Sequence, residues 1–207
     1  MLYATVITVL TCYLLGNLNG AICASALLHD DVRNHGSGNA GLTNFIRNYG
    51  ASRSLMVIAI DTGKAALACL SAGLIFEPMG LGTEGMVLGG LSVLLGHTFP
   101  ALLGFRGGKG ILSGLIVALV IDWRVAVIIL AVFSLAYGLS GYVSLGSVLA
   151  GAVFGICFAW LHHDNLPVVI GTTLISLLVL FMHRGNISRL LHGQEQKTNL
   201  FGKGKQS

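Results

Sequence analysis

Residues 125–160 read VAVIILAVFSLAYGLSGYVSLGSVLAGAVFGICFAW and contain no charged side chain over 36 positions. A helix needs about 20 apolar residues to cross the hydrocarbon core of a bilayer, so this stretch is long enough for nearly two crossings. Near its middle, residues 138–141 (Gly-Leu-Ser-Gly) supply the small and polar residues typical of a turn. The stretch therefore predicts two membrane-spanning helices, at residues 125–139 and 143–160.

The rest of the chain has the same character. Apolar residues make up 54% of the 207 positions and charged residues only 10%, against about 25% charged residues in a soluble domain. Further apolar stretches occur at residues 1–28, 54–76, 85–103, 111–121 and 166–182. The first has no basic start, which argues against a cleaved signal peptide. We predict one all-α integral membrane domain over residues 1–207, with seven transmembrane helices.

The distribution of cations predicts the orientation. If the amino terminus lies outside, the inner loops and the tail hold ten basic residues and the outer loops hold only Arg124. Such a bias marks the cytoplasmic face, so we expect an external amino terminus and a cytoplasmic carboxyl terminus. Topology also explains the net charge of +4, which therefore indicates no nucleic-acid partner. The ten inner residues are Arg33, Arg47, Arg53, Arg106, Lys109, Arg184, Arg189, Lys197, Lys203 and Lys205.

The first inner loop is rich in glycine and hydrogen-bonding residues. Residues 36–39 read Gly-Ser-Gly-Asn, a pattern that can turn successive backbone N–H groups towards one anion. Thr43, Asn44 and Arg47 follow, and the spacing of Thr43 and Arg47 places them on one face of a helix. The alternative is a flexible glycine-rich turn with helix caps.

The second inner loop reads Gly-Gly-Lys-Gly at residues 107–110 and leads into an apolar helix. Free N–H groups, the helix dipole and an ammonium together favour phosphate, although the spacing is not that of a Walker P-loop. A tight turn between helices is the alternative. His97 precedes this loop, and a lone histidine near an interface more often packs or caps a helix than catalyses.

A third segment follows the last apolar stretch. His183, Asn186 and Arg189 are spaced by three residues and share a helix face, although a basic helix lying on anionic lipid has the same pattern. Within residues 54–76, Asp61 and Lys64 form an i,i+3 pair. Ionisable residues inside a membrane are functional candidates, but mutual neutralisation is a sufficient structural reason for this pair.

Three segments suited to anions on one side of the membrane indicate a phosphorylated substrate that is approached from the inside, with an apolar partner in the bilayer. The sequence of these segments resembles the PlsY family of acyl-phosphate-dependent glycerol-3-phosphate acyltransferases. The resemblance rests on residues 31–44, 96–110, 142–145 and 183–195, which match the family motifs in order. One departure is Gly185, where the family usually has glutamate.

The resemblance implies transfer of a fatty acyl group from acyl phosphate to the 1-hydroxyl of glycerol 3-phosphate, giving lysophosphatidic acid and phosphate. It implies a bacterial inner-membrane enzyme with its core at residues 1–196, a basic tail at 197–207, and no metal, cofactor or obligate protein partner. The catalytic residues it implies are Ser37, Arg47, His97, Lys109, His183 and Asn186. The substrate-binding residues it implies are Gly36, Gly38, Asn39, Thr43, Asn44, Gly107, Gly108, Gly110, Ser144, Ser147 and Arg189.

Two points stay open at the level of sequence. The group that accepts the hydroxyl proton is His183, His97 or the departing phosphate. Two other classes of protein also fit parts of the pattern: a carrier for an organic phosphate, which the charges of Asp61 and Lys64 favour, and an inactive relative of the family, which Gly185 favours.

Overall fold

The computed structural model describes residues 1–198, and every regular element in that part of the chain is a helix. Most of the predicted basic tail, including Lys203 and Lys205, lies outside the described residues. The α-helices are α1 (Leu2–Gly16), α2 (Gly20–Ala26), α3 (Leu42–Tyr49), α4 (Leu55–Phe76), α5 (Gly82–Thr98), α6 (Ile111–Ile121), α7 (Trp123–Ser140), α8 (Val143–Leu161), α9 (Leu166–Met182) and α10 (Arg184–Leu191).

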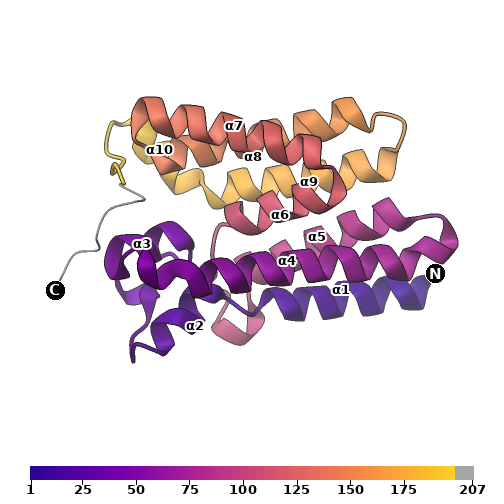
Figure 1. Cartoon of the computed structure of the whole chain (residues 1–207), viewed down its shortest axis with the longest axis horizontal. Coiled ribbons are helices and arrows are strands. Elements are labelled where there is room, and N and C mark those ends of the chain that lie inside the picture. Colours follow the sequence, from indigo (N-terminus) through magenta and orange to yellow (C-terminus); the bar gives the residue numbers. More distant parts are fainter. Residues whose placement is uncertain (199–207) are drawn as a thin grey trace.

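The long helices form two layers, which Figure 1 shows one above the other. One layer contains α1, α4 and α5, and the other contains α7, α8 and α9. The short helix α6 lies between the layers and packs against α4, α5 and α7. Helices α2, α3 and α10 gather at one end of the molecule, opposite the amino terminus (Figure 1). This end therefore collects the first and third segments that the sequence predicts for anion binding, and Lys109 of the second segment hydrogen-bonds to Asn186 of α10.

The protein is an all-helical integral membrane protein with five or six candidate spans. Five helical stretches are long and apolar enough to cross a membrane, and α9 with α10, bent by 55° at their junction, forms a sixth candidate. The sequence predicts seven spans, and the difference arises at α6, which has 11 residues. Such a helix is about 16 Å long, roughly half of the 30 Å hydrocarbon core.

The first apolar stretch is broken, whereas the sequence predicts one continuous span. Helix α1 ends at Gly16, and α2 begins at Gly20. The side chain of Asn19 accepts the N–H of Ile22 at 3.0 Å and so caps α2. Asn17 instead accepts the N–H of Leu102 at 3.0 Å, which ties the break to a distant turn. Asparagine side chains that bond backbone groups compete with helix continuation in this way.

Helix α5 also ends earlier than predicted, at Thr98 instead of residue 103. Pro100 is the cause, because proline lacks an N–H and disfavours helical conformation in the residue before it. Residues Ala101–Leu103 form a separate 3-10 turn. The early end leaves His97 in the last helical turn, beside the glycine-rich loop that precedes α6.

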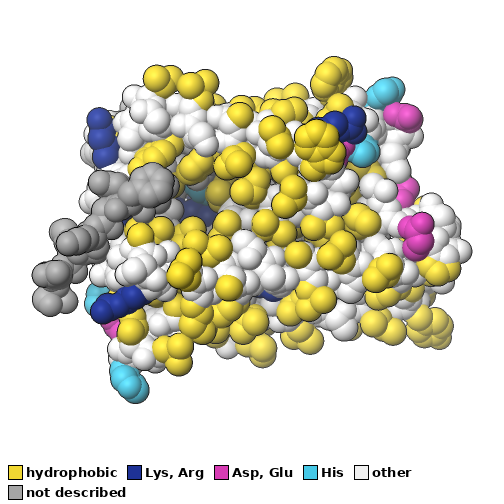
Figure 2. All heavy atoms as spheres, viewed as in Figure 1, with side chains coloured by type: hydrophobic (Ala, Val, Ile, Leu, Met, Phe, Trp, Pro, Cys, Tyr) yellow, Lys and Arg dark blue, Asp and Glu magenta, His cyan; other side chains and the backbone are white. Residues whose placement is uncertain are grey.

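Close contact between helices depends on small residues. Gly16 of α1 and Gly96 of α5 face each other so closely that a Cβ on either would overlap the backbone of the other helix. Such approach gives van der Waals contact where lipid removes the hydrophobic drive between helices. The outer surface is apolar around the middle, and most charged side chains on the visible face lie towards the two ends (Figure 2).

Candidate active site

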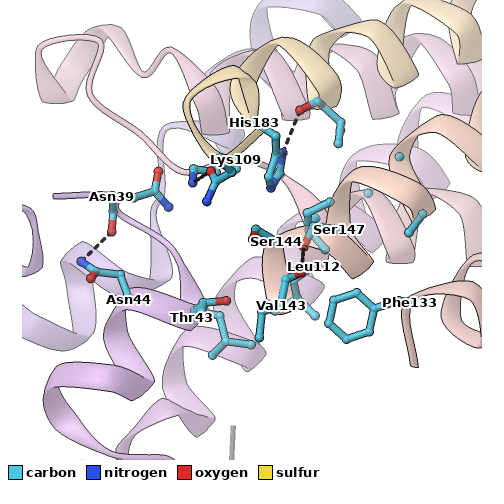
Figure 3. A pocket seen from close by; sticks show the side chains of 18 of the residues that line it. Asn39, Thr43, Asn44, Lys109, Leu112, Phe133, Val143, Ser144, Ser147 and His183 are labelled. Carbon is cyan, nitrogen blue, oxygen red and sulfur yellow. Dashed lines mark hydrogen bonds between the residues drawn. The ribbon is translucent and has the colours of Figure 1, made fainter. Parts of the chain in front are cut away.

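A cavity of about 690 Å³ lies among α3, α6, α7, α8, α9 and α10. Its polar part is formed by the start of α8, the junction of α9 and α10, α3 with the loop before it, and the loop before α6. Its apolar part lies deeper along α8 and α9, because these helices are antiparallel and present Ala150, Phe154 and Ile175 there. Figure 3 shows Lys109, His183 and Ser144 around the polar part, with Phe133 to one side. The cavity therefore has a polar end and an apolar interior.

The loop of residues 36–41 is held in shape by Asn44, a buried residue of α3. The Asn44 amide nitrogen donates to the carbonyls of Val32, His35 and Asn39 at 3.0–3.1 Å, and its oxygen accepts the N–H of Ser37 at 3.0 Å. The predicted nest of free N–H groups is therefore wrong for Ser37. The N–H of Gly38 is also used, because it donates to His35 at 3.0 Å. The loop presents side chains, not a ring of amides, to the cavity.

Lys109 stands on the loop that joins α5 to α6 and reaches across the polar end, where its ammonium donates to the side-chain oxygen of Asn186. The pKa of Lys109 is lowered to about 8, chiefly by burial and in addition by the nearby Arg189 and Arg47, against the opposing effect of Glu195. The neighbouring Gly110 caps the amino terminus of α6 and lines the same cavity. Lys109 is thus a partly desolvated cation at a helix amino terminus, an arrangement that favours phosphate.

The bend between α9 and α10 places His183 and Asn186 in the cavity wall. His183 Nδ1 lies 2.8 Å from the carbonyl of Val179. A carbonyl can only accept, so Nδ1 carries the proton and Nε2 keeps a free lone pair. The Asn186 amide nitrogen donates to Glu195 at 3.0 Å, and the same carboxylate accepts from Arg189 at 2.8 Å. Glu195 therefore orients the side chains of Asn186 and Arg189.

The segment after α10 runs along the cavity and reaches α3 at Thr198. Thr198 is buried, its hydroxyl accepts from the Arg47 guanidinium, and its N–H donates to Gly141 at 3.3 Å. Tyr137 of α7 donates to the Thr198 carbonyl at 2.9 Å. The guanidinium of Arg47 is thereby held against the cavity, on the same face of α3 as Thr43.

Two serines of α8 differ in their hydrogen bonding. Ser147 donates to the carbonyl of Val143 at 2.9 Å. The hydroxyl of Ser144 is buried and has no hydrogen-bond partner within residues 1–198. Buried hydroxyls are usually satisfied, so an unpaired one in a cavity wall is a candidate contact for a ligand.

The structure brings most of the predicted site residues to this cavity. All six predicted catalytic residues line it, as do eight of the eleven predicted binding residues. Gly38, Gly107 and Gly108 do not. Gly107 and Gly108 instead pack against the end of α5, where a Cβ would overlap His97, and the N–H of Gly108 donates to the His97 carbonyl at 3.0 Å. These two glycines position the loop instead of lining the site.

Sequence reasoning missed several lining residues. Asn48, Ser113 and Glu195 are polar members of the wall. Glu195 lies six residues after Arg189 in the third anion-binding segment, and its charge was the available signal. The apolar lining gave none, because apolar residues are equally typical of lipid-facing positions. This group includes Leu112, Leu115, Ile129, Leu130, Phe133, Val143, Ala150, Phe154, Ile175 and Val179.

The membrane fold and a cavity that joins cations to an apolar interior define a polytopic membrane enzyme of lipid chemistry. A family model described as glycerol-3-phosphate acyltransferase matches residues 6–193 of the chain. The chain belongs to the glycerol-3-phosphate acyltransferase family. This assignment decides against the organic-phosphate carrier that the charges of Asp61 and Lys64 left open.

Curated relatives and solved structures agree with the family. A glycerol-3-phosphate acyltransferase of Synechococcus sp. (strain CC9902) is 38% identical over 98% of this chain and 100% of its own length. One from Finegoldia magna is 37% identical over 91% of this chain and 93% of its own length. Crystal structures of the integral membrane glycerol 3-phosphate acyltransferase PlsY superpose with TM-scores of 0.84 for the glycerol 3-phosphate form and 0.81 for the lysophosphatidic acid form. Both are 30% identical in sequence to this chain. The alignments cover 94% and 95% of this chain, respectively, and 96% of each crystallised chain.

Proposed function

We propose that the chain transfers a fatty acyl group from acyl phosphate to the 1-hydroxyl of glycerol 3-phosphate, giving lysophosphatidic acid and phosphate. The acyltransferase activity and its product follow from the family and its PlsY-type structures. The acyl phosphate donor is what the proposal adds. It includes no metal, coenzyme A, carrier protein or obligate protein partner.

The observation that carries the proposal is the continuity of the cavity. Acyl phosphate is a phosphate joined to a long apolar chain, and the cavity offers cations at one end and an apolar interior at the other. Two phosphorylated substrates repel each other, and several cations and donors are needed to hold both. We assign this role, together with stabilisation of the oxyanion, to Ser37, Arg47, Lys109, Ser147 and Asn186. His183 joins this group only once its Nε2 has taken up a proton, because its Nδ1–H is donated to Val179.

The reaction needs one new bond and one broken bond. The 1-hydroxyl oxygen attacks the acyl carbonyl carbon, and the carbonyl electron pair moves to oxygen as the tetrahedral oxyanion forms. The oxyanion then collapses, and the bond from the carbonyl carbon to the phosphate oxygen breaks with the electron pair leaving on phosphate. Lys109 supplies positive charge where the oxyanion and the leaving phosphate develop. In many acyl transfers, such preorganised stabilisation of the oxyanion accelerates the reaction more than any other single effect.

The proton of the hydroxyl has two candidate destinations. His183 Nε2 has a free lone pair because Nδ1 donates to Val179, and a neutral imidazole is a suitable base. The departing phosphate is itself basic and needs no protein base. The hydrogen bond to Val179 supports His183 over His97 as the protein candidate.

We also propose seven spans with the amino terminus outside and the carboxyl terminus in the cytoplasm. In this arrangement α6 crosses as a short helix, and Arg106 and Lys109 of the loop before it lie on the inner side. The support is the ten-to-one bias of basic residues in the sequence. In the proposed topology the polar end of the cavity faces the cytoplasm, from which the water-soluble glycerol 3-phosphate can enter.

The test uses the purified full-length protein in detergent with acyl phosphate and glycerol 3-phosphate, following the release of phosphate and the formation of lysophosphatidic acid. We expect release that needs both substrates and falls sharply in Lys109→Ala. Acyl-coenzyme A replaces acyl phosphate in a parallel reaction. Product from acyl-coenzyme A but not from acyl phosphate would overturn the proposed donor, and no product from either would show an inactive relative.

A further inference from the structure

A buried ionic cluster lies behind the cavity, where α4 meets α5 and the break between α1 and α2. Lys64 and Asp61 of α4 form an ion pair at 2.7 Å, and both side chains are almost completely buried. Asp61 also accepts the N–H of Gly20 at 3.2 Å. Lys64 further donates to the carbonyl of Leu18 at 2.6 Å and lies 2.8 Å from His97 Nδ1. The cluster joins three segments that are far apart in the sequence.

The contacts of Lys64 determine the protonation of His97. An ammonium has three N–H donors and no acceptor. Its three shortest contacts are the Leu18 carbonyl, the Asp61 carboxylate and His97 Nδ1, and the Gly16 carbonyl lies farther away at 3.4 Å. An ammonium cannot accept a hydrogen bond from a ring N–H at 2.8 Å. His97 Nδ1 must therefore accept, and the single proton of the neutral imidazole lies on Nε2. If Lys64 served only to neutralise Asp61, its third N–H would not need to point at the ring of His97.

The protonated edge of His97 faces the active site. His97 is 4% exposed and lines the cavity together with Lys109. Its Nε2 lies against Gly108, next to Lys109 in the chain, so closely that a Cβ on Gly108 would overlap it. No residue within 1–198 accepts a hydrogen bond from His97 Nε2. The wall of the cavity thus contains a hydrogen-bond donor without a protein partner among these residues.

We propose that Lys64, held in place by Asp61, is a positioning residue that fixes His97 as an Nε2–H donor to a phosphate oxygen of a substrate. The inference rests on the proposed function, because it assigns a contact to the phosphates handled there. It gives the two histidines opposite roles. His183 has its proton on Nδ1 and a free acceptor at Nε2, whereas His97 presents a proton and cannot serve as the base. The phosphate belongs to glycerol 3-phosphate or to acyl phosphate, and the KM values of the His97 variants distinguish them.

The tautomers are tested without turnover. Nitrogen-15 NMR of the full-length protein labelled at histidine, with His97→Gln and His183→Gln for assignment, reports which ring nitrogen carries the proton. We expect Nε2–H for His97 and Nδ1–H for His183, and a shift of the His97 Nε2 signal on adding glycerol 3-phosphate or inorganic phosphate. A His97 signal with the proton on Nδ1, or one unmoved by both phosphates, overturns the proposal. Because no acyl donor is present, failure of the proposed reaction does not affect this result.

The donor role is tested by two substitutions of His97. Glutamine places an amide N–H near the position of Nε2, and phenylalanine fills the space without a donor. We expect His97→Phe to lower kcat/KM by about 10–100-fold, the scale of one hydrogen bond to a charged group, and His97→Gln to recover most of it. The substrate whose KM rises in His97→Phe is the one whose phosphate is bound. Equal loss in both variants would indicate a base or a packing role and would overturn the donor assignment.

The role of Lys64 is tested as a coupling. The double variant Lys64→Met/Asp61→Asn removes both charges, so that neither is left buried and unpaired. Its melting temperature checks that it folds. We expect roughly tenfold lower kcat/KM in the wild-type background and little effect in the His97→Gln background, whose amide does not need Lys64. Equal losses in both backgrounds would mean that Lys64 acts independently of His97 and would overturn the positioning role.

Discussion

Lys109 is the residue around which the other polar groups of the cavity are arranged. Its ammonium contacts Asn186, and its position before α6 adds the positive end of the helix. Lys109→Ala should lower turnover by roughly 10²–10³, the usual effect of removing one preorganised charge stabiliser. Lys109→Arg should also be poor, because a planar fork replaces a compact charge. Steady-state kinetics with unchanged melting temperature is the measurement. Near-normal turnover in the alanine variant would return the loop to a structural role.

The same residue predicts a pH dependence. The pKa of Lys109 in the empty site is lowered to about 8, so the working ammonium is present below that pH and is lost as the pH rises through it. Because kcat/KM reports the free enzyme, it should fall above about pH 8. In kcat the fall should lie at higher pH, since bound phosphate raises the pKa. Lys109→Arg stays charged and should lack this fall, although its rate is lower throughout. An identical fall in the arginine variant would assign the titration to another group.

We expect the hydroxyl of Ser144 to lower the stability of the empty protein and to increase its activity. Its buried, unpaired hydroxyl costs the empty protein about 1–3 kcal/mol. Ser144→Ala should therefore raise the melting temperature, while kcat/KM falls about tenfold because a hydrogen bond to substrate is lost. Thr8 of α1 has the same defect away from the cavity, so Thr8→Val is a matched control that should stabilise without changing kinetics. Wild-type kinetics in both variants would show that Ser144 does not contact substrate.

Among the elements, α10 contains the departure from the family pattern. Gly185 is exposed and does not line the cavity. Among residues 1–198, the one side chain within 4 Å of a Cβ at this position would be that of Arg189, at 3.6 Å. Replacing glycine within a helix gains up to about 1 kcal/mol, or about 2–4 °C in a chain of this size. Gly185→Glu should therefore raise stability and leave turnover nearly unchanged. Gly185→Ala separates the gain in helix propensity from a charge pair with Arg189. An inert wild type together with an active glutamate variant would describe a degenerate member of the family.

The elements themselves were largely predictable from hydropathy. The predicted stretches 54–76, 111–121 and 166–182 agree within one residue with α4, α6 and α9, because a membrane requires uninterrupted apolar helices. The break between α1 and α2 was not predictable in this way. It depends on contacts of Asn17 with Leu102 and of Asn19 with Ala40, and these partners lie far away in the sequence.

The site was predictable as a set of charged and hydroxyl residues, but its internal geometry was not. The glycine-rich loop looked like an anion nest because its composition allows one. In the structure the Ser37 amide donates to Asn44 instead, and local composition cannot reveal such a contact. The tautomers of His97 and His183 likewise depend on Lys64 and Val179, of which only the second is a near neighbour in the chain.

At the scale of the whole molecule, the charges are sorted along the long axis. Lys109, Arg47 and Arg189 meet at the end that contains α3 and α10. At the opposite end, where α6 turns into α7, Asp122 pairs with Arg124 at 2.6 Å and with His162 at 3.0 Å. The Arg124 guanidinium holds the pKa of Asp122 at about 2. One end therefore concentrates cations, of which Arg189 pairs with Glu195 whereas Lys109 and Arg47 have no ion pair among residues 1–198. At the other end, the single external cation of the proposed topology is neutralised by its neighbour.

That sorting gives a topology prediction in which α6 is the decisive element. If seven segments cross, Ser52 and Arg106 lie inside, and Thr83 and Trp123 lie outside. Single cysteines are placed at these four positions in a background without the four native cysteines. An impermeant reagent should label positions 52 and 106 from the inside and positions 83 and 123 from the outside. Ser52 and Thr83 test the crossing of α4, and Arg106 and Trp123 test α6. If Arg106 and Trp123 react from the same side while Ser52 and Thr83 do not, α6 enters and leaves the same face. The seven-span arrangement would then be replaced by one with a re-entrant α6. Reaction of the cysteines at positions 52 and 83 from the same side would overturn the seven-span model.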